Sequence, residues 1–434
     1  MPTASANASP DRASATIAAL AVTATSCFLI VPRTTPAVLA LLAAFVVTAS
    51  MRPPAFSPSW KMPQALALLL ALGLWAALSS TWAADPPEAI GKAALLIVFS
   101  AVAFWTLAQL PASRTALLRH GAWIALVAFG ACLAFLALEE ATNHVVKRQF
   151  FHMLPFTRPP ARHVVATEND LQIAGYITNR NMAAAMLGLW PMLLMVRALV
   201  DRERSLVASA ALAVLAVATF AMSMHETSSI AFAASVLVFA IGLRWPKAAL
   251  SLVTAGWLLA TLSVVPLATW AGSTAQLHSA QWLPNSARHR IVLWEYTAQH
   301  YWQRPLTGIG AASTKVLDNR RGVDVEVKPG TRYQWRSGTH AHNMYLQTWY
   351  ELGAVGALLL CLAGLSLIAA ASRLPRSTVP YATAAFTAAA VMGASTWGFW
   401  QVWFMAAFAV SSVLLGIAIR LLESSPASAD NPKL

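Results

Sequence analysis

The 434-residue chain is 58% hydrophobic and only 11% charged, against roughly 25% charged residues in an average soluble domain. A chain this poor in charge cannot cover a globule with polar surface, so much of its surface must face lipid. Its net charge of +13 would suggest nucleic acid in a soluble protein. We expect no nucleic-acid binding here, because the cations flank apolar spans, where they set topology and contact membrane lipid.

Apolar windows long enough to cross a bilayer recur from one end of the chain to the other. They predict an all-α polytopic membrane protein with about 12 transmembrane helices, in a range of eleven to thirteen. The expected spans are residues 13–31, 35–51, 63–81, 88–110, 115–138, 174–199, 205–223, 228–243, 248–270, 344–371, 380–396 and 399–421.

The distribution of cations predicts the orientation of these spans. With the N-terminus inside, the inner segments collect most of the Lys and Arg residues of the short loops, while the short outer turns hold only Arg33 and Lys92. The positive-inside rule favours this arrangement and places both termini inside. The expected organisation is spans one to nine in residues 1–270 with an outer loop at about 139–173, a large outer loop with surface helices at 271–343, the last three spans in 344–421, and an inner tail at 422–434.

The end of the large outer loop carries the most informative residues. Asn343 is a good N-cap for the tenth span, which would place His342 where that helix emerges from the membrane. A helix N-terminus favours a phosphate. Gly353 and Gly356 would form a flat patch for close helix packing. Taken alone, His342 would more often be an interfacial polar anchor than a catalytic group.

Arginine residues accompany this histidine. Residues 288–304 are predicted to form an amphipathic surface helix, on which Arg290 and Trp294 lie one turn apart and share a face. Arg180 opens the sixth span within the sequence Asn179-Arg180-Asn181, which also reads as a capped helix start. Arg288, Arg290 and Arg180 are suited to bidentate phosphate binding, although contact with lipid headgroups would explain the first two equally well.

These residues carry a family resemblance. His342-Asn343, followed after nine residues by Gly353-x-x-Gly356, resembles the signature of the O-antigen ligase superfamily, which also includes protein O-oligosaccharyltransferases and relatives of O-antigen polymerases. Arg290-x-x-x-Trp294 and Pro305-Leu-x-Gly308-x-Gly310 look like two further elements of that family, and Asn179-Arg180-Asn181 resembles its mid-chain element. The match covers about 150 residues from Arg288 to the chain end.

The resemblance implies a glycosyltransferase of the bacterial inner membrane, with both termini cytoplasmic and its active site periplasmic. Its donor would be O-antigen polysaccharide on undecaprenyl diphosphate, and its acceptor a sugar hydroxyl of the lipid A–core oligosaccharide. His342 would be the general base, with His340 as a rival two residues away. Arg290, Arg288 and Arg180 would bind the diphosphate without a metal or other cofactor, in a direct displacement that inverts the anomeric centre. Asn343, Trp294 and Glu351 are secondary candidates.

Several readings stay open beside this one. Glu351 could position the acceptor or pair with an Arg, and a structural salt bridge is its more ordinary explanation. Asp324-Val325-Glu326 superficially resembles a metal-binding Asp-x-Asp, although a solvated charge cluster explains it better. The middle of the loop, residues 311–337, is expected to contribute charge but no chemistry.

Other members of the superfamily, and one non-enzyme class, are alternative functions. An O-antigen polymerase shares the donor, the membrane and the topology, and a protein O-oligosaccharyltransferase would transfer the glycan to a protein. A transporter of lipid-linked sugars would carry ionisable groups at the bilayer midplane. The predicted spans are nearly free of such groups, and this favours an enzyme.

Overall fold

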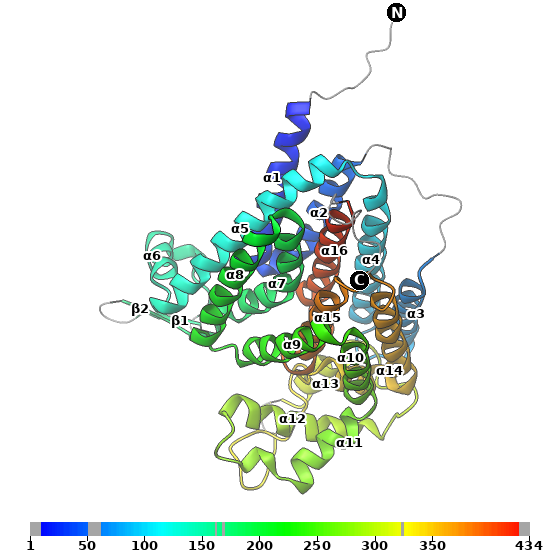
Figure 1. The fold of residues 1–434 in the computed structure, drawn as a ribbon. Helices are drawn as coiled ribbons and strands as arrows, with labels where there is room; N and C mark the ends of the chain where they lie inside the picture. Colours follow the sequence, from blue (N-terminus) through cyan, green and yellow to red (C-terminus); the bar gives the residue numbers. More distant parts are fainter. Residues whose placement is uncertain (1–9, 51–61, 161–162, 167–169, 323–324, 425–434) are drawn as a thin grey trace, which may run out of the picture. The chain divides into compact units, whose positions relative to one another are not determined.

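The computed structural model describes residues 10–50, 62–160, 163–166, 170–322 and 325–424 (Figure 1). It confirms an all-α polytopic membrane protein. Within the described residues, strands are confined to one short antiparallel hairpin, β1 (Val164–Ala166) and β2 (Leu171–Ile173). Ten described helices are long and apolar enough to cross a membrane, or eleven when one bent pair is counted as a single span.

The chain divides into two compact units, each built from segments that alternate along the sequence. The boundaries between the units fall inside some of the helices, including α9 (Glu226–Arg244) and α16 (Val402–Glu423). Unit 1 comprises residues 1–57, 102–236 and 406–434, and unit 2 comprises residues 58–101 and 237–405. Unit 1 contains α1 (Pro10–Ile30), α2 (Thr35–Ala49), α5 (Thr115–Ala141), α6 (Val145–Met153), α7 (Asn179–Leu199), α8 (Arg202–Met222), and parts of α9 and α16. In it, α1 packs against α2, α5 and α7, and α8 packs against α5 and α7.

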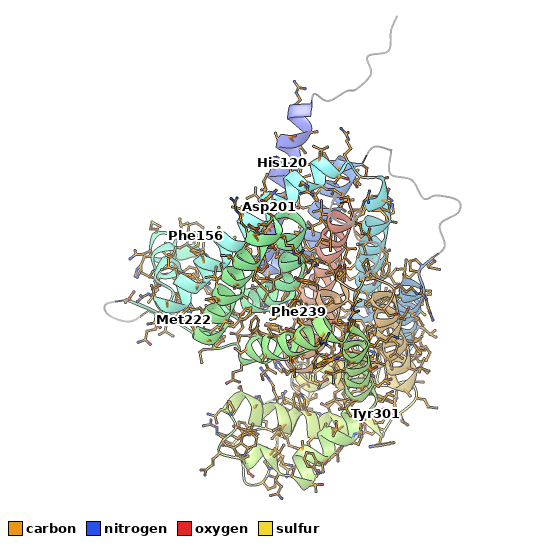
Figure 2. All side chains as sticks on the ribbon, viewed as in Figure 1. His120, Phe156, Asp201, Met222, Phe239 and Tyr301 are labelled. Atoms are coloured by element: carbon orange, nitrogen blue, oxygen red, sulfur yellow. The ribbon has the colours of Figure 1, made fainter. Side chains whose placement is uncertain are left out.

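The outer loop expected at about 139–173 folds onto unit 1 as a small layer of its own. Phe151 of α6 packs with Val164 and Leu171 of the hairpin, so these apolar side chains form a miniature core. Phe156 follows α6 and is 84% exposed (Figure 2).

Unit 2 is organised around one long helix. α14 (Met344–Ala371) contacts α3 (Gln64–Leu78), α10 (Pro246–Leu262), α12 (Asn285–Tyr301) and α15 (Val379–Ser395). The predicted surface helix at 288–304 is α12, which is three residues longer at its start and ends three residues earlier. α11 (Val264–Thr269) and the short helical turns at Trp270–Thr274 and Leu277–Ser279 also contact α12, and α13 (Ser313–Arg320) follows it in the chain.

Two predicted spans differ from expectation. The ninth, 248–270, is broken between α10 and Val264, where the axes of its two parts are bent by 68°. Pro266 lies just after the break, and a proline there cannot donate the helical hydrogen bond to Leu262. The eleventh span is α15, whose 17 residues fall short of the roughly 20 that a straight crossing needs.

The middle of the large outer loop is more structured than the sequence suggested. The Arg336 guanidinium forms a two-pronged ion pair with the carboxylate of Asp318, which is only 3% exposed. The Lys328 ammonium lies 2.6 Å from the carboxylate of Glu295 on α12 and 4.4 Å from the centre of the Trp335 ring. These pairs link Lys328 to α12 and Arg336 to α13. The expectation that residues 311–337 contribute charge but no chemistry stays a prediction.

Candidate active site

The start of α14 is built as the sequence predicted. Asn343 is the N-cap, and its side-chain oxygen accepts a hydrogen bond of 3.0 Å from the backbone N–H of Leu346. The residue before it, His342, has a φ of +52°. This left-handed conformation is uncommon for a residue with a side chain and occurs most often where the surroundings hold the backbone in place.

The ring of His342 is held by a backbone group from another element. Its Nδ1 lies 2.5 Å from the carbonyl oxygen of Thr396, in the connection between α15 and α16. A carbonyl oxygen can only accept, so Nδ1 carries the proton and donates it. In a neutral imidazole the other nitrogen, Nε2, then has the free lone pair that a general base requires.

His340 takes the opposite tautomer. Its Nδ1 accepts a hydrogen bond of 3.3 Å from the backbone N–H of His342, and the two rings lie edge to face with their centres 4.1 Å apart. A neutral His340 must therefore carry its proton on Nε2, which makes that atom a donor. This geometry distinguishes the two rival bases, because only His342 offers Nε2 as an acceptor.

Burial and nearby positive charge hold both rings neutral. The pKa of His342 is lowered to about 3: burial is the largest cause, His340 and Arg290 act in the same direction, and the hydrogen bond to Thr396 opposes them. Burial and the charge of Arg290 lower the pKa of His340 to about 4. Both imidazoles are therefore uncharged at neutral pH.

α12 contributes a positively charged side chain and a hydrogen bond to the segment that carries the two histidines. The Trp294 indole N–H donates a hydrogen bond of 2.7 Å to the carbonyl of Ala341, between the two histidines. Arg290, one turn earlier on that face, is close enough for its charge to depress the pKa of His340 and of His342. The structure thus brings together four of the predicted residues: His342, His340, Arg290 and Trp294.

Of the other two predicted arginines, Arg288 has a partner on its own helix and Arg180 lies in the other unit. Arg288 lies two positions from Arg290, and residues at that spacing point away from each other on a helix. Its guanidinium bonds Asn285 in the preceding turn at 2.5 Å. Arg180 belongs to unit 1, so its part in a diphosphate site stays a prediction.

The predicted capping at the start of α7 is wrong. The N-cap there is Thr178, which makes no side-chain capping bond. The Asn181 amide instead donates to the carbonyls of Leu29 and Ile30, at 2.7 and 2.9 Å. That asparagine ties α7 to the end of α1 rather than closing the helix.

The glycine motif makes a break in α14 rather than a patch for helix packing. Gly353 has φ +65° and ψ −166°, a conformation essentially restricted to glycine. A Cβ at Gly353 would lie 2.2 Å from the carbonyl oxygen of Leu306. The Ala354 N–H, freed by the break, donates to the Pro305 carbonyl at 2.8 Å, and Gly310 N–H donates to the Glu351 carbonyl at 2.9 Å. The segment Pro305–Gly310 and the segment Gly353–Gly356 therefore pack against each other through their backbones.

Glu351 is fully buried and makes no salt bridge in the described residues, contrary to the expected explanation. Its carboxylate accepts hydrogen bonds from neutral donors only: the N–H of Ala312 and both N–H and O–H of Thr314 in the outer loop, the Gln347 amide, and the Trp400 indole. Sequence reasoning missed Gln347 and Thr396. Gln347 had a signal, because Asn343, Gln347 and Glu351 recur every four residues on an otherwise apolar helix.

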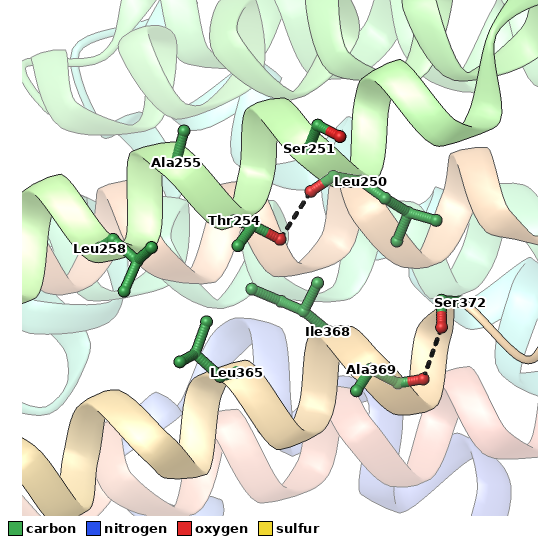
Figure 3. A pocket seen from close by; sticks show the side chains of 9 residues that line it. All are labelled: Leu250, Ser251, Thr254, Ala255, Leu258, Leu365, Ile368, Ala369 and Ser372. Carbon is green, nitrogen blue, oxygen red and sulfur yellow. Dashed lines mark hydrogen bonds between the residues drawn. The ribbon is translucent and has the colours of Figure 1, made fainter.

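Asp324 of the acidic tripeptide is outside the described residues, so the metal-binding alternative stays untested. An open groove between α10 and α14 is lined mainly by apolar side chains, including Leu258, Leu365 and Ile368 (Figure 3). Leu365 comes about six helical turns after His342, so the groove is remote from the histidines.

A family model matches a segment that includes both histidines, Arg290 and Trp294, and ends before Thr396. The family model described as O-antigen ligase matches residues 211–361. Over this segment the chain is similar to the O-antigen ligase family. It is 27% identical over 148 residues to a putative polysaccharide ligase of Rickettsia conorii and 26% identical over 148 residues to one of Rickettsia prowazekii, each match covering 34% of this chain. The matched segments make up 34% and 35% of those two proteins, about a third of their length.

Proposed function

We propose that this protein is a periplasmic-face glycosyltransferase that joins a polysaccharide to an acceptor hydroxyl. The donor is O-antigen on undecaprenyl diphosphate, and the acceptor is a sugar hydroxyl of lipid A–core. The acceptor oxygen forms a bond to the anomeric carbon while the bond from that carbon to the diphosphate oxygen breaks. His342 Nε2 takes the hydroxyl proton, and the bonding electron pair leaves on the diphosphate. Attack opposite the leaving group inverts the anomeric centre.

The observation that carries the proposal is the hydrogen bond from His342 Nδ1 to the Thr396 carbonyl. It selects the tautomer with a basic Nε2 and fixes the direction in which that lone pair points. A positioned base contributes about 10²–10⁴-fold to such a proton transfer. The family-model match over residues 211–361 and the similarity to putative polysaccharide ligases support the class of reaction.

The charges of the site suit an anionic leaving group. Arg290 lies near both histidines, and its guanidinium can hold a phosphate by two parallel hydrogen bonds. The N-terminus of α14 adds a partial positive charge beside His342. A bound diphosphate would offset the positive field that lowers the pKa of His342, so donor binding would strengthen the base at the moment it is needed.

The test uses purified protein with lipid-linked donor and core acceptor. We expect His342→Ala to lose about 10²–10⁴-fold in transfer rate, while the variant retains its unfolding temperature. Full activity of a folded His342→Ala would refute the assignment of the base. A gel of lipopolysaccharide from a strain that lacks the gene distinguishes the family activities. Bare core without O-antigen supports the ligase, and core with a single repeat unit would point to a polymerase. Normal lipopolysaccharide together with loss of a glycosylated protein would point to a protein O-oligosaccharyltransferase.

A further inference from the structure

The connection between α15 and α16, residues 396–401, packs around the two histidines. α15 ends at Ser395 and α16 begins at Val402. Thr396 holds the His342 ring through its carbonyl. Two residues later, a Cβ added at Gly398 would lie 2.6 Å from the Cβ of His340 and 2.8 Å from the Gln347 side-chain oxygen. The backbone of this connection therefore sits directly against both imidazoles and against Gln347.

The connection lacks a regular helix and depends on side chains of α14 for its shape. The Gln347 carbonyl oxygen accepts a hydrogen bond of 2.8 Å from the backbone N–H of Phe399. The Gln347 amide N–H donates to Glu351 at 3.1 Å, and the Trp400 indole N–H donates to the same carboxylate. Gln347 and Glu351 are 3% and 0% exposed, so water cannot replace these bonds when one is removed.

We infer that Gln347 is a positioning residue that fixes the Thr396 carbonyl, and through it the orientation and tautomer of His342. Gln347 has no contact with the reacting atoms. It connects Glu351, which is anchored to the outer loop at Ala312 and Thr314, to the backbone that carries the His342 acceptor. This inference rests on the proposed function, because it assigns Gln347 a part in the same proton transfer.

The sequence of α14 provides a matched pair of variants. Gln347→Met keeps the length of the side chain and removes both hydrogen bonds. Thr348→Val is the control, because the neighbouring Thr348 is also buried and its hydroxyl bonds only its own helix, at the Met344 carbonyl. A merely structural role would give the two variants similar kinetics.

We expect Gln347→Met to lower kcat by on the order of 10²-fold, because a misplaced catalytic group can have that effect, with KM for the lipid-linked donor changed less than about threefold. Thr348→Val should keep the wild-type kcat. Trp400→Phe, which removes a second donor from Glu351, should lower kcat in the same sense by a smaller factor.

Three results overturn the inference. One is a Gln347→Met protein with wild-type kcat, and another is a loss that appears in KM alone. The third is a loss that tracks unfolding temperature equally in Gln347→Met and Thr348→Val. If His342→Ala is inactive while Gln347→Met is fully active, the inference fails and the proposed function survives. If His342→Ala is active, the proposed base itself is wrong.

Discussion

The starts of α14 and α7 look alike in the sequence and differ in the structure. Both follow a segment that the sequence predicts to lie on the outer face, and both have an Asn beside a positively charged or titratable residue. At α14 the Asn343 side chain caps the helix, and the preceding His342 is fixed by Thr396. At α7 the Asn181 side chain bonds the carbonyls at the end of α1. A capping residue at the right place therefore indicates a helix start, but only the tertiary partners decide whether a reactive group is held there.

The largest expected effect is a difference in kcat/KM between alanine variants of the two arginines of α12. Arg290→Ala should lower kcat/KM by about 10²–10³-fold, because it removes a positioned donor for the charge of the leaving group. Arg288→Ala should have a much smaller effect, since Arg288 bonds Asn285 on its own helix. Initial rates with purified lipid-linked donor measure both. Equal losses in the two variants would show that both arginines reach the diphosphate.

A test of Arg180→Ala extends the same comparison to α7. If α7 contributes to the diphosphate site as proposed, this variant should resemble Arg290→Ala in kcat/KM at unchanged unfolding temperature. Wild-type kinetics for Arg180→Ala would restrict the site to unit 2.

The break in α14 should be the next most sensitive feature. Gly353→Ala should destabilise the protein by about 2–5 kcal/mol, because a Cβ would clash with the Leu306 carbonyl and the backbone conformation is strained for alanine. Gly130→Ala in α5 is the control, since nothing lies within 4 Å of its added Cβ. Alanine there should be neutral or stabilising by up to about 1 kcal/mol. Thermal unfolding in detergent compares them, and equal unfolding temperatures would contradict the observed contact.

The two helix starts predict opposite outcomes for two asparagines. Asn343→Ala should cost about 1 kcal/mol of stability, the usual effect of losing an N-cap. Asn179→Ala should cost nothing or stabilise slightly, because the Asn179 side-chain oxygen is buried without a hydrogen-bond partner among the described residues. The same unfolding assay measures both. A larger loss from Asn179→Ala would mean that α7 also depends on a side-chain cap.

The smallest expected effect is on pH dependence. His342 must be neutral to act as a base, and its lowered pKa keeps it neutral well below its ordinary value of 6.5. The kcat/KM of the enzyme should therefore change less than about twofold between pH 7 and pH 5.5, and should fall only at more acidic pH. The acid limb of kcat should lie at higher pH, because the bound diphosphate raises the pKa of the imidazole. A fall of kcat/KM to half its maximum near pH 6.5 would contradict the lowered pKa of His342.

Much of the fold followed from the sequence, since all twelve apolar windows contain helix in the structure. The breaks at Val264 and Gly353 did not, because each depends on how a neighbouring segment packs. For the site, the sequence singled out Asn343, His342, Arg290 and Trp294, and it predicted that Arg290 and Trp294 share a face of one helix. Helical spacing alone could have separated Arg288 from Arg290. The Thr396 contact had no sequence signal, because it uses a backbone carbonyl that any residue would supply.

The central claim is that the base is Nε2 of His342 and not a nitrogen of His340. His342→Asn and His340→Asn test it directly, because an asparagine amide can replace the Nδ1 hydrogen bond of either ring and has nothing in place of Nε2. We measure single-turnover transfer by both purified variants. The account predicts that His342→Asn loses about 10²–10⁴-fold and that His340→Asn keeps most of the rate. Wild-type turnover by His342→Asn, with the loss appearing in His340→Asn instead, would contradict it.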